Sequence, residues 1–188
     1  MELYPKCVHD SVLEGDYSGK IITYGEMNYS GIDQIIKKFP DYTFTSFLDI
    51  GSGRGKLCLY IAAQSNILKS IGIELVTERH ADAINLKEKL LKYNSITNKV
   101  QFINGDFLEY NLNEFVDTTP LVWISNLCFN SDLTNKVINK LITDMPSGTI
   151  IGCSKEYTGL NTKLSKIDMI PIKMSWAETS MVYLYKIE

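Results

Sequence analysis

The sequence predicts one α/β domain with a largely parallel β-sheet, and three observations support this fold class. Short apolar runs alternate with helical patterns between Phe44 and Ser154, as in consecutive strand–helix–strand units. Two more apolar runs, 169–176 and 181–187, follow without a helix between them and predict a final hairpin. A length of 188 residues with 45% hydrophobic content is enough for one core. We therefore expect a seven-stranded, mostly parallel sheet with helices on both faces.

The individual elements follow from apolar spacing and from the residues that interrupt it. A helix is expected from Ser30, because apolar residues recur at helical spacing from Ile32 to Phe39, and Pro40 ends it. Residues 1–27 have weak periodicity and are expected to form an irregular arm with a cofactor-capping loop, ahead of a domain over 28–188. The other expected elements are strands over 44–50, 70–75, 99–106, 121–126 and 149–154, and helices over 56–64, 77–93 and 131–144.

Charge and cysteine usage restrict the class of partner and the compartment. The net charge of -3 argues against strong general binding to nucleic acid, which usually requires a basic face. The four cysteines have neither zinc-ligand spacing nor a disulfide pattern, and Cys58, Cys128 and Cys153 are expected to be buried thiols because they lie in apolar runs. No apolar run reaches the ~18 to 20 residues of a membrane span. We expect an intracellular protein with no metal site and no membrane contact.

A glycine-rich loop follows the first expected strand. Residues 49–55 read DIGSGRG, an acid followed by three glycines at alternate positions. A Walker loop needs four residues between its glycines and then Lys with Ser or Thr, whereas leucine follows Lys56 here. The dinucleotide fingerprint needs a glycine where Lys56 stands. Glycines let a ligand approach the backbone closely, and Asp49 would attract a cation and repel a pyrophosphate. The loop therefore favours S-adenosyl-L-methionine, which carries an ammonium and a sulfonium but no phosphate.

Two further acids end the next two expected strands. Glu74 is placed to accept hydrogen bonds from both hydroxyls of a ribose. Asp106 can accept a hydrogen bond from an adenine amino group, while the ring of Phe107 covers one face of the base. Because the carboxyl ends of parallel strands share one edge of the sheet, Asp49, Glu74 and Asp106 are expected to surround one S-adenosylmethionine site.

With these residues placed, the chain from about residue 21 to residue 188 resembles the catalytic core of the disruptor-of-telomeric-silencing family, the non-SET histone lysine methyltransferases. The resemblance implies the class I methyltransferase (Rossmann-like) fold and S-adenosylmethionine-dependent protein lysine N-methylation. The family's first asparagine after the fourth strand is Ser125 here, and its glutamine after the glycine loop is Lys56. The matching segments, in order, are TYGE (23–26), DIGSGRGK (49–56), GIE (72–74), GDFL (105–108), WISNLCF (123–129) and SWAETSMVYLY (175–185).

The resemblance also implies roles for individual residues. Ser125 and Asn126 would orient the cofactor or the incoming amine. An apolar channel formed by Phe129, Trp176 and Tyr183 would admit the substrate lysine and favour its neutral form by desolvation. The implied cofactor-binding residues are Tyr24 and Glu26 over the methionine end, with Asp49, Gly51, Ser52, Gly53, Gly55, Lys56, Glu74, Asp106, Phe107 and Asn126.

The implied substrate is a protein with a target lysine, which includes histones or the nucleosome. Three alternatives remain open at this point: a non-histone protein lysine, an RNA or small-molecule substrate, and a subunit that binds the cofactor without catalysis. A histone substrate would place the chain in the nucleus, and another protein substrate would place it in the cytoplasm.

Overall fold

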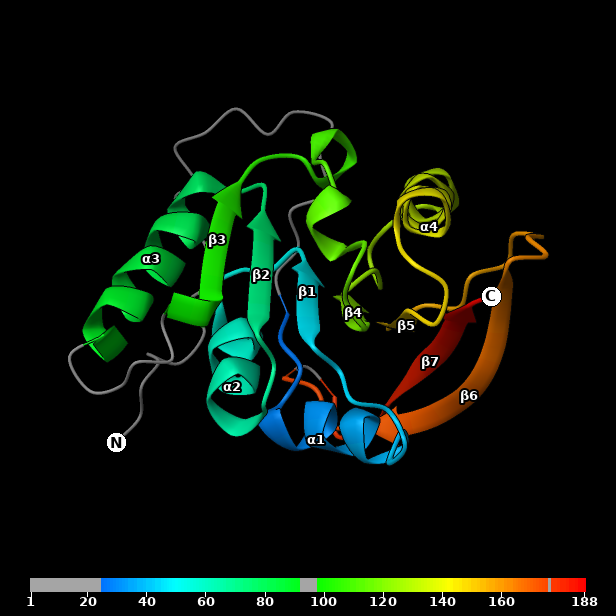
Figure 1. Ribbon diagram of the computed structural model, residues 1–188, viewed down its shortest axis with the longest axis horizontal. Coiled ribbons are helices and arrows are strands. Elements are labelled where there is room, and N and C mark those ends of the chain that lie inside the picture. The colour runs from blue at the N-terminus through cyan, green and yellow to red at the C-terminus, as the bar shows by residue number, and fades with distance from the viewer. Residues whose placement is uncertain (1–24, 92–97, 176) are drawn as a thin grey trace.

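The computed structural model describes residues 25–91, 98–175 and 177–188, and it has one seven-stranded sheet in the order β3-β2-β1-β4-β5-β7-β6. Strands β1 to β5 pair in parallel, while β7 is antiparallel to both of its neighbours, β5 and β6. Figure 1 shows β1, β2 and β3 pointing to the same edge of the sheet, with β6 and β7 at the opposite side of the molecule from β3. The predicted mostly parallel sheet with a final hairpin is confirmed.

Most element bounds agree with the sequence pattern, and α2 and α4 begin and end at the predicted residues. Strand β6 differs, because it starts five positions before the predicted residue 169 and ends at Ile172. Its first half is polar and lies at the sheet edge, where a register shift between Lys166 and Asp168 interrupts the alternation. The elements are α1 (Tyr29–Lys37), β1 (Ser46–Ile50), α2 (Lys56–Gln64), β2 (Lys69–Glu74), α3 (Thr77–Leu91), β3 (Val100–Asn104), β4 (Pro120–Ile124), α4 (Ser131–Asp144), β5 (Ile150–Cys153), β6 (Leu164–Ile172) and β7 (Ser180–Ile187), with short 3-10 turns η2 (Phe107–Glu109) and η3 (Asn113–Phe115).

Alternate side chains of each strand enter two separate cores, one on each face of the sheet. On β1, Phe47 packs with α1, α2 and α3 in the first core, whereas Leu48 packs with α4 and the 3-10 turns in the second. Successive side chains of a strand point to opposite faces of the sheet. A strand that is apolar on both faces must therefore be covered on both sides. Burial of both faces explains why β4 and β5 read as unbroken apolar runs, and β1 is likewise buried at every position although it contains Ser46 and Asp49.

The segment before α1 is fixed to the turn that joins β6 to β7. Met27 forms a β-bridge with Met174, and the Ser175 backbone N–H donates to the Glu26 carbonyl over 2.8 Å. The Ser175 hydroxyl in turn accepts from the Glu26 backbone N–H over 3.0 Å. These contacts hold residues 25–27 beside the loop that follows β1. Residues 1–24 of the predicted arm lie outside the described residues.

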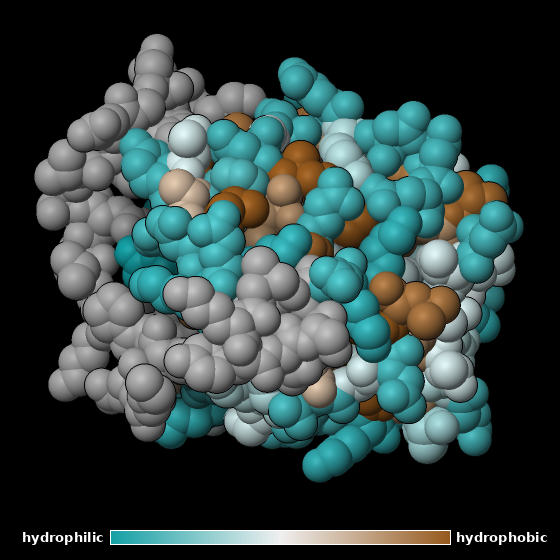
Figure 2. Space-filling model, turned by 60° about the vertical axis from the view of Figure 1, so that its left-hand side comes forward, coloured by the Kyte–Doolittle hydropathy of each residue, from teal (hydrophilic) through white to brown (hydrophobic). Residues whose placement is uncertain are grey.

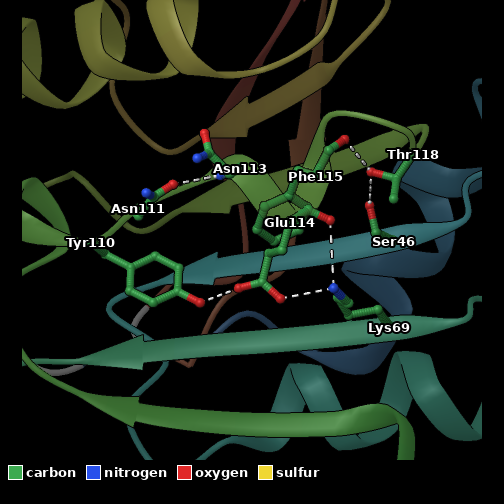
Figure 3. A network of polar contacts seen from close by, with 8 residues as sticks. All are labelled: Ser46, Lys69, Tyr110, Asn111, Asn113, Glu114, Phe115 and Thr118. Carbon is green, nitrogen blue, oxygen red and sulfur yellow. Dashed lines mark hydrogen bonds and ion pairs between the residues drawn. The ribbon is translucent and has the colours of Figure 1, made fainter.

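The connection from β3 to β4 is tied to the amino-terminal ends of β1 and β2 by the network drawn in Figure 3. Lys69 at the start of β2 donates to the Glu114 carboxylate over 2.8 Å, and the Tyr110 hydroxyl binds the other oxygen of that carboxylate. The Ser46 hydroxyl donates to Thr118 over 2.8 Å. The network therefore fixes the far end of a connection that begins with Asp106 and Phe107.

On the face drawn in Figure 2, the coloured surface is mainly hydrophilic, and its apolar residues form separate small areas. Cys58 and Cys153 are buried free thiols as predicted, but Cys128 is exposed. The prediction for Cys128 was wrong because β4 ends at Ile124, so the apolar run continues into a turn outside the sheet. Within the described ranges, no helix is both long enough and apolar enough to cross a bilayer.

Candidate functional site

The glycine loop joins β1 to α2 at the carboxyl edge of the sheet. Gly51, Gly53 and Gly55 all have positive φ, between 54° and 80°, which side-chain-bearing residues rarely adopt. The backbone N–H groups of Gly51 and Ser52 donate to the Ile73 carbonyl over 2.9 and 3.0 Å. The loop is therefore folded back against the end of β2 and brings the ends of β1 and β2 into one site.

Glu74 fixes this loop from the end of β2. Its carboxylate accepts from the Gly53 N–H over 2.7 Å through one oxygen and from the Val76 N–H over 2.8 Å through the other. The side chain is 5% exposed, and burial raises its pKa despite these two donors and nearby Arg79. Glu74 thus orders the loop and presents its carboxylate to the adjacent cavity.

Two cavities lie along the carboxyl edge and share Gly25, Gly51 and Ser125 as lining residues. The larger has a volume of about 360 Å³, within the ~300 to 1,000 Å³ typical of small-molecule pockets. Glu74, Asp106 and Phe107 are part of its lining. The smaller, of about 20 Å³, lies next to Glu26, Asp49, Ser52, Lys56 and Trp123. The smaller cavity, which has room for about one water, therefore extends the larger one toward Asp49 at these shared residues.

Two acids, Glu26 and Asp49, line the smaller cavity together with Lys56. Asp49 is 3% exposed, and burial, together with the nearby carboxylates of Glu74 and Glu26, raises its pKa from 3.8 to about 8. Lys56 binds Glu26 over 3.3 Å, which connects the glycine loop to the segment before α1. The Ser52 hydroxyl is buried without a hydrogen-bond partner among the described residues. An ionised Asp49 with an unsatisfied hydroxyl nearby suits an ammonium with attached polar groups.

Asp49 gives a prediction about the pH dependence of stability. Its folded-state pKa is raised, so the stability that it contributes is full below pH about 4 and is lost as the pH rises to about 8. The measured quantity is the difference in free energy of unfolding, wild type minus Asp49→Asn, from urea unfolding without cofactor. We expect this difference to decrease as the pH is raised from 5 to 8.5. A difference that stays constant or rises would contradict this assignment.

The same substitution is expected to act in the opposite direction when cofactor is present. The cofactor ammonium favours an ionised carboxylate, so Asp49→Asn should weaken cofactor binding at pH 8.5 although it stabilises the free chain there. Asp33→Asn is a matched control, because Asp33 accepts from the Tyr60 hydroxyl and is not among the described residues that line either cavity.

The larger cavity brings together the predicted ribose and adenine residues. Asp106 caps the turn η2 by accepting from the Leu108 N–H over 3.0 Å, and Phe107 is 6% exposed at the cavity wall. Arg79 also lines this cavity from α3 and is 6% exposed. Sequence reasoning missed Arg79, since a single arginine in a polar helix pattern carries no signal of burial. Its charge lowers the pKa of Glu74 against the effect of burial.

The residues predicted to handle a lysine do not all reach the cavities. Ser125 lines both cavities, and Phe129 lines the larger one. Asn126 is 1% exposed and is not among the described residues that line either cavity, because its amide binds the backbone of Lys155. Tyr183 on β7 packs partly buried against the second core, with the Lys166 ammonium 5.0 Å from its ring centroid. Tyr24 and Trp176 lie outside the described residues.

Comparisons with known proteins find relatives of this chain. The family model described as "Histone methylation protein DOT1" matches residues 4–183. An H3 lysine-79 specific histone-lysine N-methyltransferase of Caenorhabditis elegans is 31% identical over 146 residues, which are 75% of this chain and 15% of that protein. The enzyme of the same name from Drosophila melanogaster is 25% identical over 146 residues, 76% of this chain and 8% of that protein. The chain thus spans a small part of both relatives.

A shorter relative and two solved structures complete the comparison. A protein-lysine N-methyltransferase of Saccharolobus islandicus is 27% identical over 115 residues, 61% of this chain and 65% of that protein. An RNA methyltransferase from Salinibacter ruber in complex with S-adenosyl-L-homocysteine has a TM-score of 0.64 at 18% identity, over 85% of this chain and 92% of that one. TrmK of M. capricolum with the same ligand has a TM-score of 0.64 at 14% identity, over 87% of this chain and 70% of that one. The fold is therefore the class I, Rossmann-like methyltransferase fold.

Proposed function

Because the chain belongs to the histone methylation protein DOT1 family, we propose that it transfers a methyl group to the side-chain nitrogen of a lysine in a protein substrate. S-adenosyl-L-methionine is the cofactor. When bound, it supplies a methyl group attached to a sulfonium, and the sulfur leaves as a neutral thioether. The observation that carries the proposal is the pair of cavities that meet at Ser125, one with a ribose- and adenine-compatible lining and one beside the acid Asp49.

The fit of the cofactor rests on the donors and acceptors of the two cavities. Glu74 and Asp106 would hold the nucleoside, with Phe107 against the base. Asp49, Glu26 and the unsatisfied Ser52 hydroxyl would hold the amino-acid end. Among the described residues, no group of three His, Cys, Asp or Glu side chains could hold a metal ion.

The remaining tasks of the chain are to favour the neutral form of the incoming amine, whose proton passes to solvent water, and to align that amine. A lysine ammonium has no free electron pair, so the site must favour the neutral amine, and partly buried apolar side chains such as Phe129 do this by desolvation. Ser125 lies where both cavities meet and would orient the amine through its hydroxyl. Well-oriented reactants gain ~7 to 11 kcal/mol from positioning alone, so alignment can supply most of the rate enhancement.

Histone, free or in the nucleosome, is the proposed substrate. The two relatives named as H3 lysine-79 specific support it, and a histone substrate requires nuclear localisation. A non-histone protein is the second candidate, supported by the relative named as a protein-lysine N-methyltransferase, and it would be compatible with the cytoplasm. The net charge of -3 gives the chain no general attraction for nucleic acid, which favours a protein over RNA as acceptor.

The test is methyl transfer from radiolabelled S-adenosylmethionine to nucleosomes, free core histones, a cell protein extract and total RNA, in separate reactions. Gly51→Arg is the negative control. Gly51 lines both cavities and has φ +80°, so an added side chain enters the ligand space and also strains the loop. We expect label on a histone lysine that is absent with Gly51→Arg. Label on lysine of another protein alone would redirect the substrate, and label on RNA alone would overturn lysine methylation.

A further inference from the structure

We infer that Lys155 is a positioning residue for methyl transfer: with Asn126, it fixes the segment of residues 125–130 that forms the wall between the cofactor and the incoming lysine. We call this arrangement the 126–155 clamp. The inference rests on the proposed function for its kinetic readout, and it has a second readout that does not depend on activity.

Segment 125–130 leaves the carboxyl end of β4 and supplies one wall of the larger cavity. Ser125, Phe129 and Asn130 line that cavity, and Ser125 also lines the smaller one. Within the segment, the Phe129 N–H donates to the Asn126 carbonyl over 3.0 Å, which makes a tight turn. A turn with one internal hydrogen bond is weakly held by itself, so its position depends on what binds it from outside.

Lys155 provides that outside support through its backbone and its side chain. The Asn126 amide accepts from the Lys155 N–H over 2.9 Å and donates to the Lys155 carbonyl over 3.2 Å. The Lys155 ammonium donates to the Phe129 carbonyl over 2.8 Å. One residue thereby binds both ends of the turn, and the bond from the ammonium is charge-assisted and hence stronger than a neutral one.

The place of Lys155 in the fold makes the clamp rigid. It lies two residues after β5, the strand beside β4, and the Ser154 N–H extends the pairing by donating to the Ile124 carbonyl over 3.3 Å. The Cys153 thiol donates to the Lys155 carbonyl over 3.1 Å. Lys155 is not among the described residues that line a cavity, so it acts through Phe129 and not by contact with a reactant.

The clamp also changes the interpretation of Asn126. The resemblance implied that this amide contacts the cofactor or the amine, whereas here both of its polar atoms are bound to the Lys155 backbone. Its 1% exposure leaves no route to a ligand without breaking those bonds. Asn126 is therefore the second positioning residue, and Ser125 is the polar residue of the segment that lines both cavities.

The test uses the full chain with three variants. Lys155→Met keeps the length and the apolar stem of the side chain but removes the ammonium. Lys155→Arg keeps a charged donor. Lys163→Met is the matched control, because Lys163 is exposed and its ammonium makes no hydrogen bond or ion pair with the described residues. One measurement is methyl-transfer kinetics on the acceptor found above. The other is hydrogen–deuterium exchange of the peptide covering residues 125–130, with S-adenosylhomocysteine bound.

We expect Lys155→Met to lower kcat by about 10- to 100-fold, since a 1 Å misplacement can cost ~10²-fold, while the cofactor Kd changes less than about threefold. Exchange in the 125–130 peptide should rise, Lys155→Arg should restore most of both properties, and Lys163→Met should match wild type.

Unchanged exchange in Lys155→Met would show that the ammonium does not hold the segment, and would overturn the inference that the Lys155 side chain is part of the clamp. Faster exchange with unchanged kcat would overturn its role in positioning. If wild type transfers no methyl group to any acceptor, the proposed function fails, and the exchange result alone still decides whether the clamp exists.

Discussion

Gly55→Ala is expected to lower the free energy of unfolding by about 2–5 kcal/mol and to disorganise the cofactor site. Gly55 has φ +75°, and the left-handed region costs a residue with a Cβ ~1–2 kcal/mol. A Cβ at this position would also overlap the ring of Phe102 and lie 3.0 Å from the Ala83 Cβ. Overpacking of a filled core costs a further ~1–3 kcal/mol. Urea unfolding of the variant and wild type measures the sum.

Gly148→Ala is the matched control for Gly55→Ala. Gly148 has φ +88°, but a Cβ there would meet no atom within 4 Å, so only the backbone cost of ~1–2 kcal/mol applies. The loss of stability should therefore be clearly smaller than in Gly55→Ala. Equal losses in the two variants would show that contact with Phe102 contributes nothing, and would contradict the close packing of the glycine loop on β3.

Glu74→Gln is expected to weaken binding of S-adenosylhomocysteine about 10- to 100-fold and also to destabilise the free chain. The Gly53 and Val76 N–H groups both donate to the Glu74 carboxylate, and an amide can accept only one of them. Hydrogen bonds to a charged group contribute ~1.5–3 kcal/mol, and the orphaned donor is buried. The loop would then no longer hold its shape beside the ribose position. Calorimetric titration gives the change in affinity.

Glu109→Gln makes the same chemical change at an exposed position of η2, close in sequence to Asp106. It should leave both affinity and stability within experimental error of wild type. If Glu74→Gln also left the affinity unchanged, that result would contradict the role of Glu74 at the site.

Much of the fold follows from the sequence, because buried parallel strands and amphipathic helices leave strong patterns. The helix over 131–144 is an example, since Asn130 caps its start and apolar residues recur on one face. The start of β6 could not be predicted in this way, because an edge strand exposes one side and a bulge breaks its alternation. The turns η2 and η3 are too short to show periodicity.

The same distinction applies to the candidate site: residues in local sequence patterns could be predicted, and residues placed by contacts between distant elements could not. Glu74 and Asp106 follow recognisable strand patterns, so their convergence at one edge could be deduced. The partnership of Asn126 with Lys155 spans 29 positions and depends on β4 and β5 being neighbours, which the local sequence does not encode. Arg79 is similar, because its burial results from the packing of α3 beside the cavity.

The crystal structure of the chain with S-adenosylhomocysteine tests the central claim most directly. We predict that the ribose hydroxyls bind Glu74, that the base lies against Phe107 beside Asp106, and that the amino-acid end lies beside Asp49 in the smaller cavity. Asn126 should remain bound to Lys155, with Ser125 the polar group nearest the sulfur. A ligand outside the two cavities, or one that draws the Asn126 amide away from Lys155, would contradict this account.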